Sequence, residues 1–146
     1  YLSNTNFQDK KLPTYQALLK ANLEEFKNTL ISLFASIPYN NYVKNNISNF
    51  EGYYASVVYA YLASLGVEII AEDVTNKGRI DITLLIKDKI YIIEFKVGNN
   101  DALTQIKNKN YHQKYLNQNK EIYLIGINFD EDEKNISGFG YERVGS

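Results

Sequence analysis

The chain of 146 residues contains no cysteine, no tryptophan and a single histidine, His112. Without cysteine, the protein cannot use disulfide bonds, a cysteine-ligated zinc site or a thiol nucleophile. One histidine excludes metal centres built from several histidines and argues against a Ser-His-Asp triad. No run of about eighteen or more apolar residues is present, so the sequence predicts no transmembrane helix.

Methionine is also absent, and the sequence begins at Tyr1. We therefore expect a fragment of a longer protein, in which no targeting signal can be read. The length is that of one domain, and a hydrophobic content of 45% allows a core of useful size. This composition argues against intrinsic disorder.

Acidic and basic residues nearly balance. Sixteen lysines and arginines stand against 17 aspartates and glutamates, which gives a net charge of −1 and an isoelectric point near 5.9. Because the sequence-independent part of DNA binding is electrostatic, proteins that grip duplex DNA are usually basic. As a total, this charge disfavours a strong free-standing DNA binder.

The first part of the chain predicts a tail and two helices. Residues 1–13 are polar and lack periodicity, so we expect a tail or linker. Apolar residues at helical spacing over residues 14–37 predict one amphipathic helix. Ser48 and Glu51 have the spacing of a capping box and predict the start of a second helix, which ends near Gly66.

The rest of the chain is dominated by strands. The pattern predicts a strand over 67–72, a hairpin over 79–97, a helix over 101–116 capped by Asn100 or Asp101, and strands over 121–129 and near 138–144. The resulting order is α-α-β-β-β-α-β-β. It predicts a mixed α/β layer, with residues 14–146 as a single domain and a core over about 48–129.

The predicted hairpin carries three charges on one face. Because side chains alternate along a strand, Asp81 on the first strand shares a face with Glu94 and Lys96 on the second. A two-residue turn at Asp88 and Lys89 would pair Asp81 with Lys96 and leave Glu94 diagonally across, at about 7–8 Å between Cα atoms. A four-residue turn would instead put Asp81 and Glu94 directly opposite, and an odd-length turn would separate their faces.

Charges on strands this apolar need compensation, because an unpaired buried charge is expensive and two close carboxylates repel. A hard divalent cation such as Mg²⁺ would compensate both carboxylates. Lys96 could then position or deprotonate an attacking water, which is the equipment for hydrolysing a phosphodiester. The alternative is an edge hairpin with a solvated ion-pair cluster, such as Lys96 with Asp81.

This constellation resembles the PD-(D/E)XK nuclease superfamily, which has the restriction-endonuclease-like fold. That superfamily has an acidic residue on one strand and a (D/E)-x-K motif on its hairpin partner, here Asp81 in GRIDI and Glu94 with Lys96 in IIEFKV. Its α-β-β-β-α-β core matches residues 49–129. Stretches such as LFASIPYNNY, EGYYASVVYAYLASLG and ALTQIKNKNYHQKY are similar to a bacterial subfamily in which this domain follows an AAA-ATPase-like domain, so the resemblance covers roughly residues 15–145.

The resemblance implies metal-dependent cleavage of nucleic acid, DNA more than RNA, by a bacterial cytoplasmic protein. It implies that Asp81 and Glu94 are ligands of Mg²⁺ or Mn²⁺ and that Lys96 is the catalytic lysine. In many relatives a helical glutamate also supports the metal, which here falls on Glu51, although a capping box explains that residue equally well. In some relatives a glutamine on the following helix completes the site, and Gln105 is the candidate, with a solvated helix position as the alternative.

One departure concerns the helix after the hairpin. Superfamily nucleases with a Gln-x-x-x-Tyr motif have a tyrosine where this chain has Lys109, and Tyr111 is out of phase, so their DNA-end chemistry does not transfer directly. A basic and aromatic approach for nucleic acid could be formed by Tyr111 and Tyr115 together with Lys107, Lys109, Lys114 and Lys120. A solvated helix face is the alternative. Arg79, just before the Asp81 position, could contact a phosphate or form a surface salt bridge.

Two further readings stay open. The domain could be a catalytically inactive nuclease-like module that binds nucleic acid or a protein partner, or a small-molecule phosphodiesterase. The balanced charge predicts weak DNA binding by this chain alone. We therefore expect the ATPase-like part of the same protein, or a second copy of the chain in a homodimer, to strengthen the contact, and we expect no membrane partner.

Overall fold

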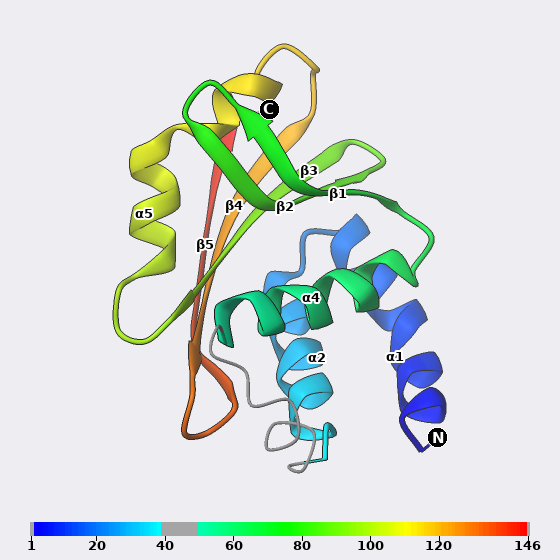
Figure 1. The fold of residues 1–146 in the computed structure, drawn as a ribbon. Helices are drawn as coiled ribbons and strands as arrows, with labels where there is room; N and C mark the ends of the chain where they lie inside the picture. Colours follow the sequence, from blue (N-terminus) through cyan, green and yellow to red (C-terminus); the bar gives the residue numbers. More distant parts are fainter. Residues whose placement is uncertain (1, 39–49, 146) are drawn as a thin grey trace.

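The computed structural model describes residues 2–38 and 50–145, with side chains over 11–38 and 52–144 (Figure 1). Its elements, in chain order, are α1 (Leu2–Leu19), α2 (Leu23–Ala35), α4 (Phe50–Ala63), β1 (Glu68–Thr75), β2 (Gly78–Ile86), β3 (Lys89–Val97), α5 (Ala102–Lys109), the 3₁₀ helix η1 (Tyr111–Tyr115), β4 (Glu121–Asp130) and β5 (Asn135–Gly145). The predicted mixed α/β fold with a restriction-endonuclease-like core is confirmed. Across the described residues, no helix has both the length and the apolar composition needed to cross a membrane.

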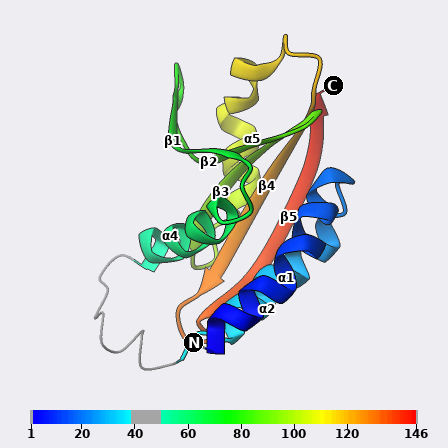
Figure 2. The same ribbon diagram turned by 90° about the vertical axis from the view of Figure 1, so that its right-hand side faces the viewer.

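The five strands form one sheet in the order β1-β2-β3-β4-β5. Neighbouring strands are antiparallel except β3 and β4, which are parallel. A parallel pair cannot be joined by a tight turn, so the chain leaves β3, passes through α5 and η1 over one face of the sheet, and returns as β4 (Figure 2). This crossover places α5 beside the open end of the β2–β3 hairpin, away from its turn.

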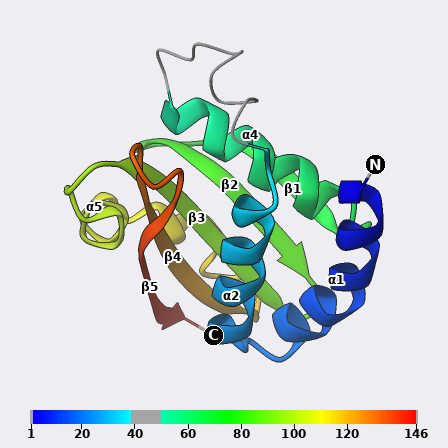
Figure 3. The same cartoon turned by 90° about the horizontal axis from the view of Figure 1, so that it is seen from below.

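The sheet is covered on both faces, which makes two separate apolar cores. Figure 3 shows α1 and α2 on the opposite side of the sheet from α5. As the alternation predicts, one face of the hairpin packs into the larger core with α1, α2 and α4, through Ile82, Leu84, Ile86, Tyr91, Ile93 and Phe95. The smaller core lies under α5 and η1.

The alternation fails at one position. Ile80, expected on the same face as Ile82, packs in the smaller core. The β1–β2 ladder pairs Ala71 with Ile82 and Asp73 with Ile80, and the residue between on β1, Glu72, has a φ of 52°. This left-handed residue interrupts the regular strand beside Asp81, so the strand irregularity falls where the sequence predicts the site.

The expected single helix over 14–37 is wrong, because two helices occupy this region. Ala21 has a φ of 57°, and the Asn22 side chain accepts a hydrogen bond of 3.2 Å from the Glu25 backbone N–H to cap α2. Residues 2–13, expected to be an irregular tail, belong to α1. The predicted cap at Ser48 lies outside the described residues.

The expected helix over 101–116 is also divided. Asp101 caps α5 as predicted, but Asn110 has a φ of 53° and ends the helix, after which η1 continues in a new direction. This turn sends Tyr111 and Tyr115 into the smaller core, where they are 3% and 4% exposed. The prediction of an aromatic surface on this segment is therefore wrong for both tyrosines.

A buried carboxylate joins η1 to the β1–β2 hairpin. Asp73 is 3% exposed and accepts hydrogen bonds from Thr83 on β2 and from Lys114 and Tyr115 on η1. Burial raises the pKa of Asp73, but the hydrogen bonds from Lys114, Tyr115 and Thr83 together outweigh burial. The pKa of Asp73 therefore lies below its usual value. The network fixes η1, and with it the end of α5, against the hairpin.

Helix α5 lies unusually close to β4 because of a glycine. A Cβ atom at Gly126 would lie 2.2 Å from the backbone nitrogen of Leu103 and 2.5 Å from its Cα atom. In the parallel β3–β4 ladder, Gly126 pairs with Glu94. The glycine therefore allows α5 to approach the sheet directly beside one of the predicted site residues.

We expect Gly126→Ala to lower the free energy of unfolding by about 1–3 kcal/mol, because backbone atoms of α5 must move to admit the methyl group. Gly138→Ala on β5 is the matched control, since its Cβ would meet only the Asn128 side chain at 3.4 Å. Urea denaturation followed by circular dichroism measures both. Equal stability of the two variants would contradict the close packing at Gly126.

Candidate active site

The register of the hairpin places the two predicted metal ligands opposite each other. The turn lies at Lys87 and Asp88, so Ile86 pairs with Lys89, and the ladder runs to Ile82 and Ile93. One step further, the same register sets Asp81 against Glu94. The expected turn at Asp88 and Lys89 is wrong, and the direct opposition that a longer turn would give is the observed register.

The shifted turn has a local cause. Lys87 adopts a left-handed φ of 55°, which closes the turn one residue earlier than expected. Lys89 is then part of β3, where its buried ammonium group contacts the carboxylates of Asp88 at 3.2 Å and Glu121 at 3.7 Å. In the observed register Asp81 still lies close to Glu94, because the charge of Asp81 acts on the Glu94 carboxyl group.

The Asp81 carboxylate is fixed to the neighbouring strand. Its Oδ2 atom accepts a hydrogen bond of 2.9 Å from the backbone N–H of Phe95, the residue after Glu94. Asp81 is half-buried. A side chain thus replaces the backbone ladder at this point and holds one carboxylate beside the other.

The surroundings of Glu94 strongly perturb its carboxyl group. Burial, and next the charge of Asp81, raise the pKa of Glu94 to about 8, while Lys96 and Lys109 act in the opposite direction. Its Oε1 atom is buried and has no hydrogen-bond partner within the described residues. A buried carboxylate oxygen without a donor, beside a second carboxylate, fits the oxygen-rich environment that a hard divalent cation prefers.

Lys96 and Tyr111 complete the immediate surroundings. The pKa of Tyr111 is raised by burial and by the charges of Glu94 and Asp81, and is lowered by Lys96, so all four groups lie close together. The structure therefore brings Asp81, Glu94 and Lys96 together as predicted. The structure also adds Tyr111, which is out of phase with the Gln-x-x-x-Tyr motif in a continuous helix. The bend at Asn110 turns Tyr111 toward the sheet.

Two other predicted residues are not joined to this group by any described contact. Glu51 lies in the first turn of α4, but its side chain is outside the described part of the structure. Gln105 lies on α5 and is half-buried, and no described hydrogen bond joins its side chain to the carboxylates. Among the side chains that the structure describes, no three His, Cys, Asp or Glu residues are grouped as a metal site. The described acids near the hairpin end therefore offer a pair of ligands.

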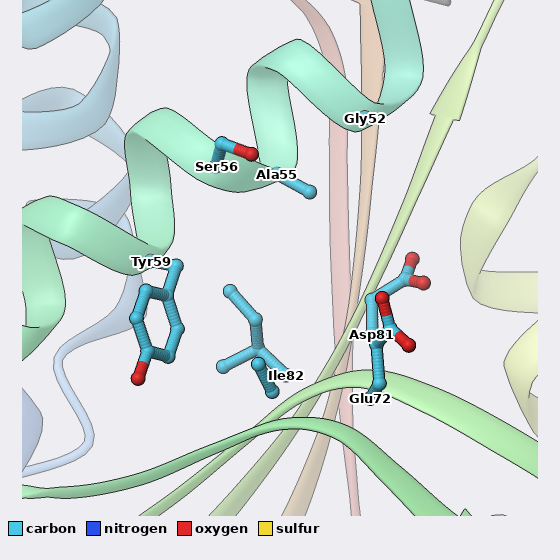
Figure 4. Close-up of a pocket in the computed structure, with 8 residues that line it drawn as sticks. Gly52, Ala55, Ser56, Tyr59, Glu72, Asp81 and Ile82 are labelled. Atoms are coloured by element: carbon cyan, nitrogen blue, oxygen red, sulfur yellow. The ribbon is translucent and has the colours of Figure 1, made fainter.

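Sequence reasoning missed a pocket beside Asp81. It has a volume of about 430 Å³ and lies between α4 and the β1–β2 strands, as Figure 4 shows. The carboxylates of Asp81 and Glu72 lie at one end, and Glu72 forms an ion pair of 3.0 Å with Arg79. Arg79 thus forms the surface salt bridge that was one of its two predicted roles. Glu72 has a left-handed φ of 52° at this point, which no sequence pattern reveals.

The fold agrees with comparisons to known proteins. A family model of the PD-(D/E)XK nuclease superfamily matches residues 49–139, and the chain belongs to this superfamily. A protein of Azotobacter chroococcum mcd 1, named as an uncharacterized protein in the vnfD 5' region, is 39% identical over 135 residues, covering 90% of this chain and 26% of the relative. This chain therefore spans about a quarter of that relative's length. No solved structure was found to match this chain.

The raised pKa of Glu94 predicts a pH dependence of stability in the metal-free protein. Between the ordinary value of 4.5 and about 8, the folded carboxyl keeps a proton that the unfolded chain loses. The free energy of unfolding should therefore fall as pH rises through this window, by about 1.4 kcal/mol for each pH unit from this group. Urea denaturation in EDTA from pH 5 to pH 8 measures the slope.

Glu94→Gln should remove that part of the slope, whereas Glu133→Gln, in the exposed turn before β5, should leave it unchanged. The same pH slope in the parent and in Glu94→Gln would contradict the assignment of a raised pKa to Glu94.

Proposed function

We propose that this domain is a metal-dependent nuclease that hydrolyses phosphodiester bonds of nucleic acid, with DNA as the expected substrate. The observation that carries the proposal is that Glu94, whose buried Oε1 atom receives no hydrogen bond from any described residue, lies close to Asp81 and Lys96. Superfamily membership supports it, because members typically use a divalent metal. The reaction would be hydrolysis with water as the nucleophile.

In this proposal Asp81 and Glu94 hold Mg²⁺ or Mn²⁺. The bound cation supplies Lewis acidity toward the phosphate oxygens and compensates the two carboxylates. Asp81 is kept in place by the hydrogen bond that its Oδ2 atom accepts from the Phe95 N–H. Lys96 orients the attacking water or a phosphate oxygen, and its charge stabilises negative charge that develops on the phosphoryl group.

Glu51 and Gln105 stay predictions in this scheme. Gly52, the residue after Glu51, lines the same pocket as Asp81, which supports a role for Glu51 near the metal. Gln105 lies on α5, the helix that Gly126 allows to approach the sheet beside Glu94, which supports a role for it near the site.

We also propose that the domain works as part of a longer protein with an AAA-ATPase-like domain in a bacterial cytoplasm. The length of the Azotobacter relative supports this, because the chain covers 26% of it. The balanced charge supports it too, since a net charge of −1 gives little non-specific affinity for DNA. A homodimer is the second arrangement that would supply the missing contacts.

The charge also favours one alternative, a catalytically inactive nuclease-like module that binds nucleic acid or a protein partner. Intact Asp81, Glu94 and Lys96 speak against it, because a retired site has no reason to retain all three. Cleavage and metal-binding assays separate the two functions.

We expect the chain to cut labelled DNA in the presence of Mg²⁺ or Mn²⁺, and Glu94→Ala to reduce the rate at least about 100-fold, because electrostatic stabilisation of the phosphoryl group is lost. Gel assays with single- and double-stranded DNA and RNA measure this. Glu133→Ala, an exposed acid in the turn before β5, should cut like the parent. Cleavage that survives in Glu94→Ala would indicate a contaminating nuclease.

Metal binding should depend on the same carboxylates. We expect Asp81→Asn to weaken Mn²⁺ binding at least about tenfold, since even the loss of an indirect partner of a ligand costs that much. Asp132→Asn, on the exposed turn, is the matched control. Calorimetry or the Mn²⁺ paramagnetic resonance signal measures the affinity. Equal binding by both variants, together with no cleavage by the parent, would favour the inactive module.

A further inference from the structure

The pocket beside Asp81 has a defined cause in the sequence of α4. Gly52, Ala55, Ser56 and Tyr59 are spaced three or four residues apart and therefore share one face of the helix. The three small residues leave space between α4 and the strands, and Tyr59 closes one end of it (Figure 4). The opposite face of α4 packs in the larger core through Tyr54, Val58, Tyr61 and Leu62.

The walls of the pocket differ in chemistry. Tyr59 is half-buried and packs against the larger core, so its ring is held in place while part of it lines the pocket. Ile82 provides a second apolar surface beside it, and Asp81 and Glu72 form the acidic end (Figure 4). The volume of about 430 Å³ lies within the usual range for small-molecule sites.

The charges select which part of a nucleotide can enter. Asp81 and Glu72 repel a phosphate, and Glu72 has its ion pair with Arg79 outside the apolar part of the pocket. A neutral nucleobase meets no such repulsion, and an aromatic ring is a surface on which any base can stack. The pocket therefore fits a base, while the adjoining phosphate stays at the carboxylate pair.

We propose that this pocket holds the base of one unpaired nucleotide next to the phosphodiester that is cut, with the base stacked on Tyr59, so that the domain acts on single-stranded nucleic acid. The inference rests on the proposed nuclease function and assigns its substrate class. In a duplex each base is paired and stacked, and entry into the pocket would require the base to leave the helix at a cost of a few kcal/mol. A single strand offers its bases without that cost.

The direct test is the affinity for short single-stranded and double-stranded DNA, measured by fluorescence anisotropy with Ca²⁺ in place of Mg²⁺ and with the oligonucleotide checked for integrity. We expect Tyr59→Ala to weaken single-strand binding about 5- to 100-fold, because an aromatic stacking surface is lost, and Tyr59→Phe to retain it. Duplex binding should be the same in all three proteins.

Two further variants separate pocket occupancy from a general loss of structure. Ser56→Leu fills the pocket from an exposed helix position and leaves Tyr59 in place, so it should weaken single-strand binding to a similar degree. Tyr141→Ala removes an exposed tyrosine from β5, away from the pocket lining, and should bind like the parent. Circular dichroism and thermal unfolding show whether each variant is folded.

Photocrosslinking with a single strand that carries 5-iodouracil identifies the contact itself. We expect the crosslink on the peptide that contains Tyr59, and none from the matching duplex. A crosslink confined to other peptides, equal weakening of duplex and single-strand binding by Tyr59→Ala, or unchanged single-strand binding by Ser56→Leu and Tyr59→Ala would overturn the proposal.

These outcomes are distinguishable from a failure of the nuclease function. Cleavage that requires Glu94 but is indifferent to Tyr59 would overturn the pocket assignment alone. Single-strand binding that requires Tyr59, without any metal-dependent cleavage, would overturn the nuclease function and leave the pocket as the binding site of an inactive module.

Discussion

The candidate site depends on the register of the β2–β3 hairpin. The last described backbone pair joins Ile82 and Ile93, and beyond it the Asp81 carboxylate accepts the Phe95 N–H. The Asp81 side chain, and not a backbone carbonyl, thereby accepts the Phe95 N–H directly beside Glu94. Because strand side chains repeat with a period of two, a slip by one residue would send one carboxylate to the other face of the sheet. The hairpin therefore sets the spacing of the acids before any helix is considered.

The second constraint comes from the parallel pair of β3 and β4. Glu94 and Gly126 are partners in this ladder, and the absence of a side chain at Gly126 lets α5 lie almost against the sheet. The close packing of α5 encloses Glu94 on the side of the sheet that α5 covers. Burial is the main cause of the raised pKa of Glu94. The bend at Asn110 then turns Tyr111 toward the same carboxylates. Two backbone features, a glycine and a left-handed residue, thus convert an exposed strand end into an enclosed one.

Much of this arrangement follows from local patterns in the sequence. Alternating apolar residues predict both strands and their inward faces, and the even spacing of the turn keeps Asp81, Glu94 and Lys96 together. The pattern fails where a single residue adopts a left-handed conformation, at Ala21, Glu72, Lys87 and Asn110, because these are non-glycine residues whose backbone is set by tertiary packing. At Ala21, Lys87 and Asn110 the left-handed residue ended or shifted an element, and beside Glu72 it changed the face on which Ile80 packs. The pocket at Tyr59 could not be predicted for the same reason, since it needs the space between an exposed helix face and an interrupted strand.

The buried carboxylate of Asp73 has a consequence for how the crossover finds its place. Thr83, Lys114 and Tyr115 come from two separate segments, and all three donate to this one residue. If η1 docked one turn out of place, a still-buried Asp73 would lose the donors Lys114 and Tyr115 and keep only Thr83, at a cost of several kcal/mol. In the docked state the hydrogen bonds outweigh the burial of the charge, since the pKa of Asp73 lies below its usual value. The buried Asp73 carboxylate therefore destabilises a misplaced docking of the crossover, in which it lacks the donors of η1, and so favours the native position of η1.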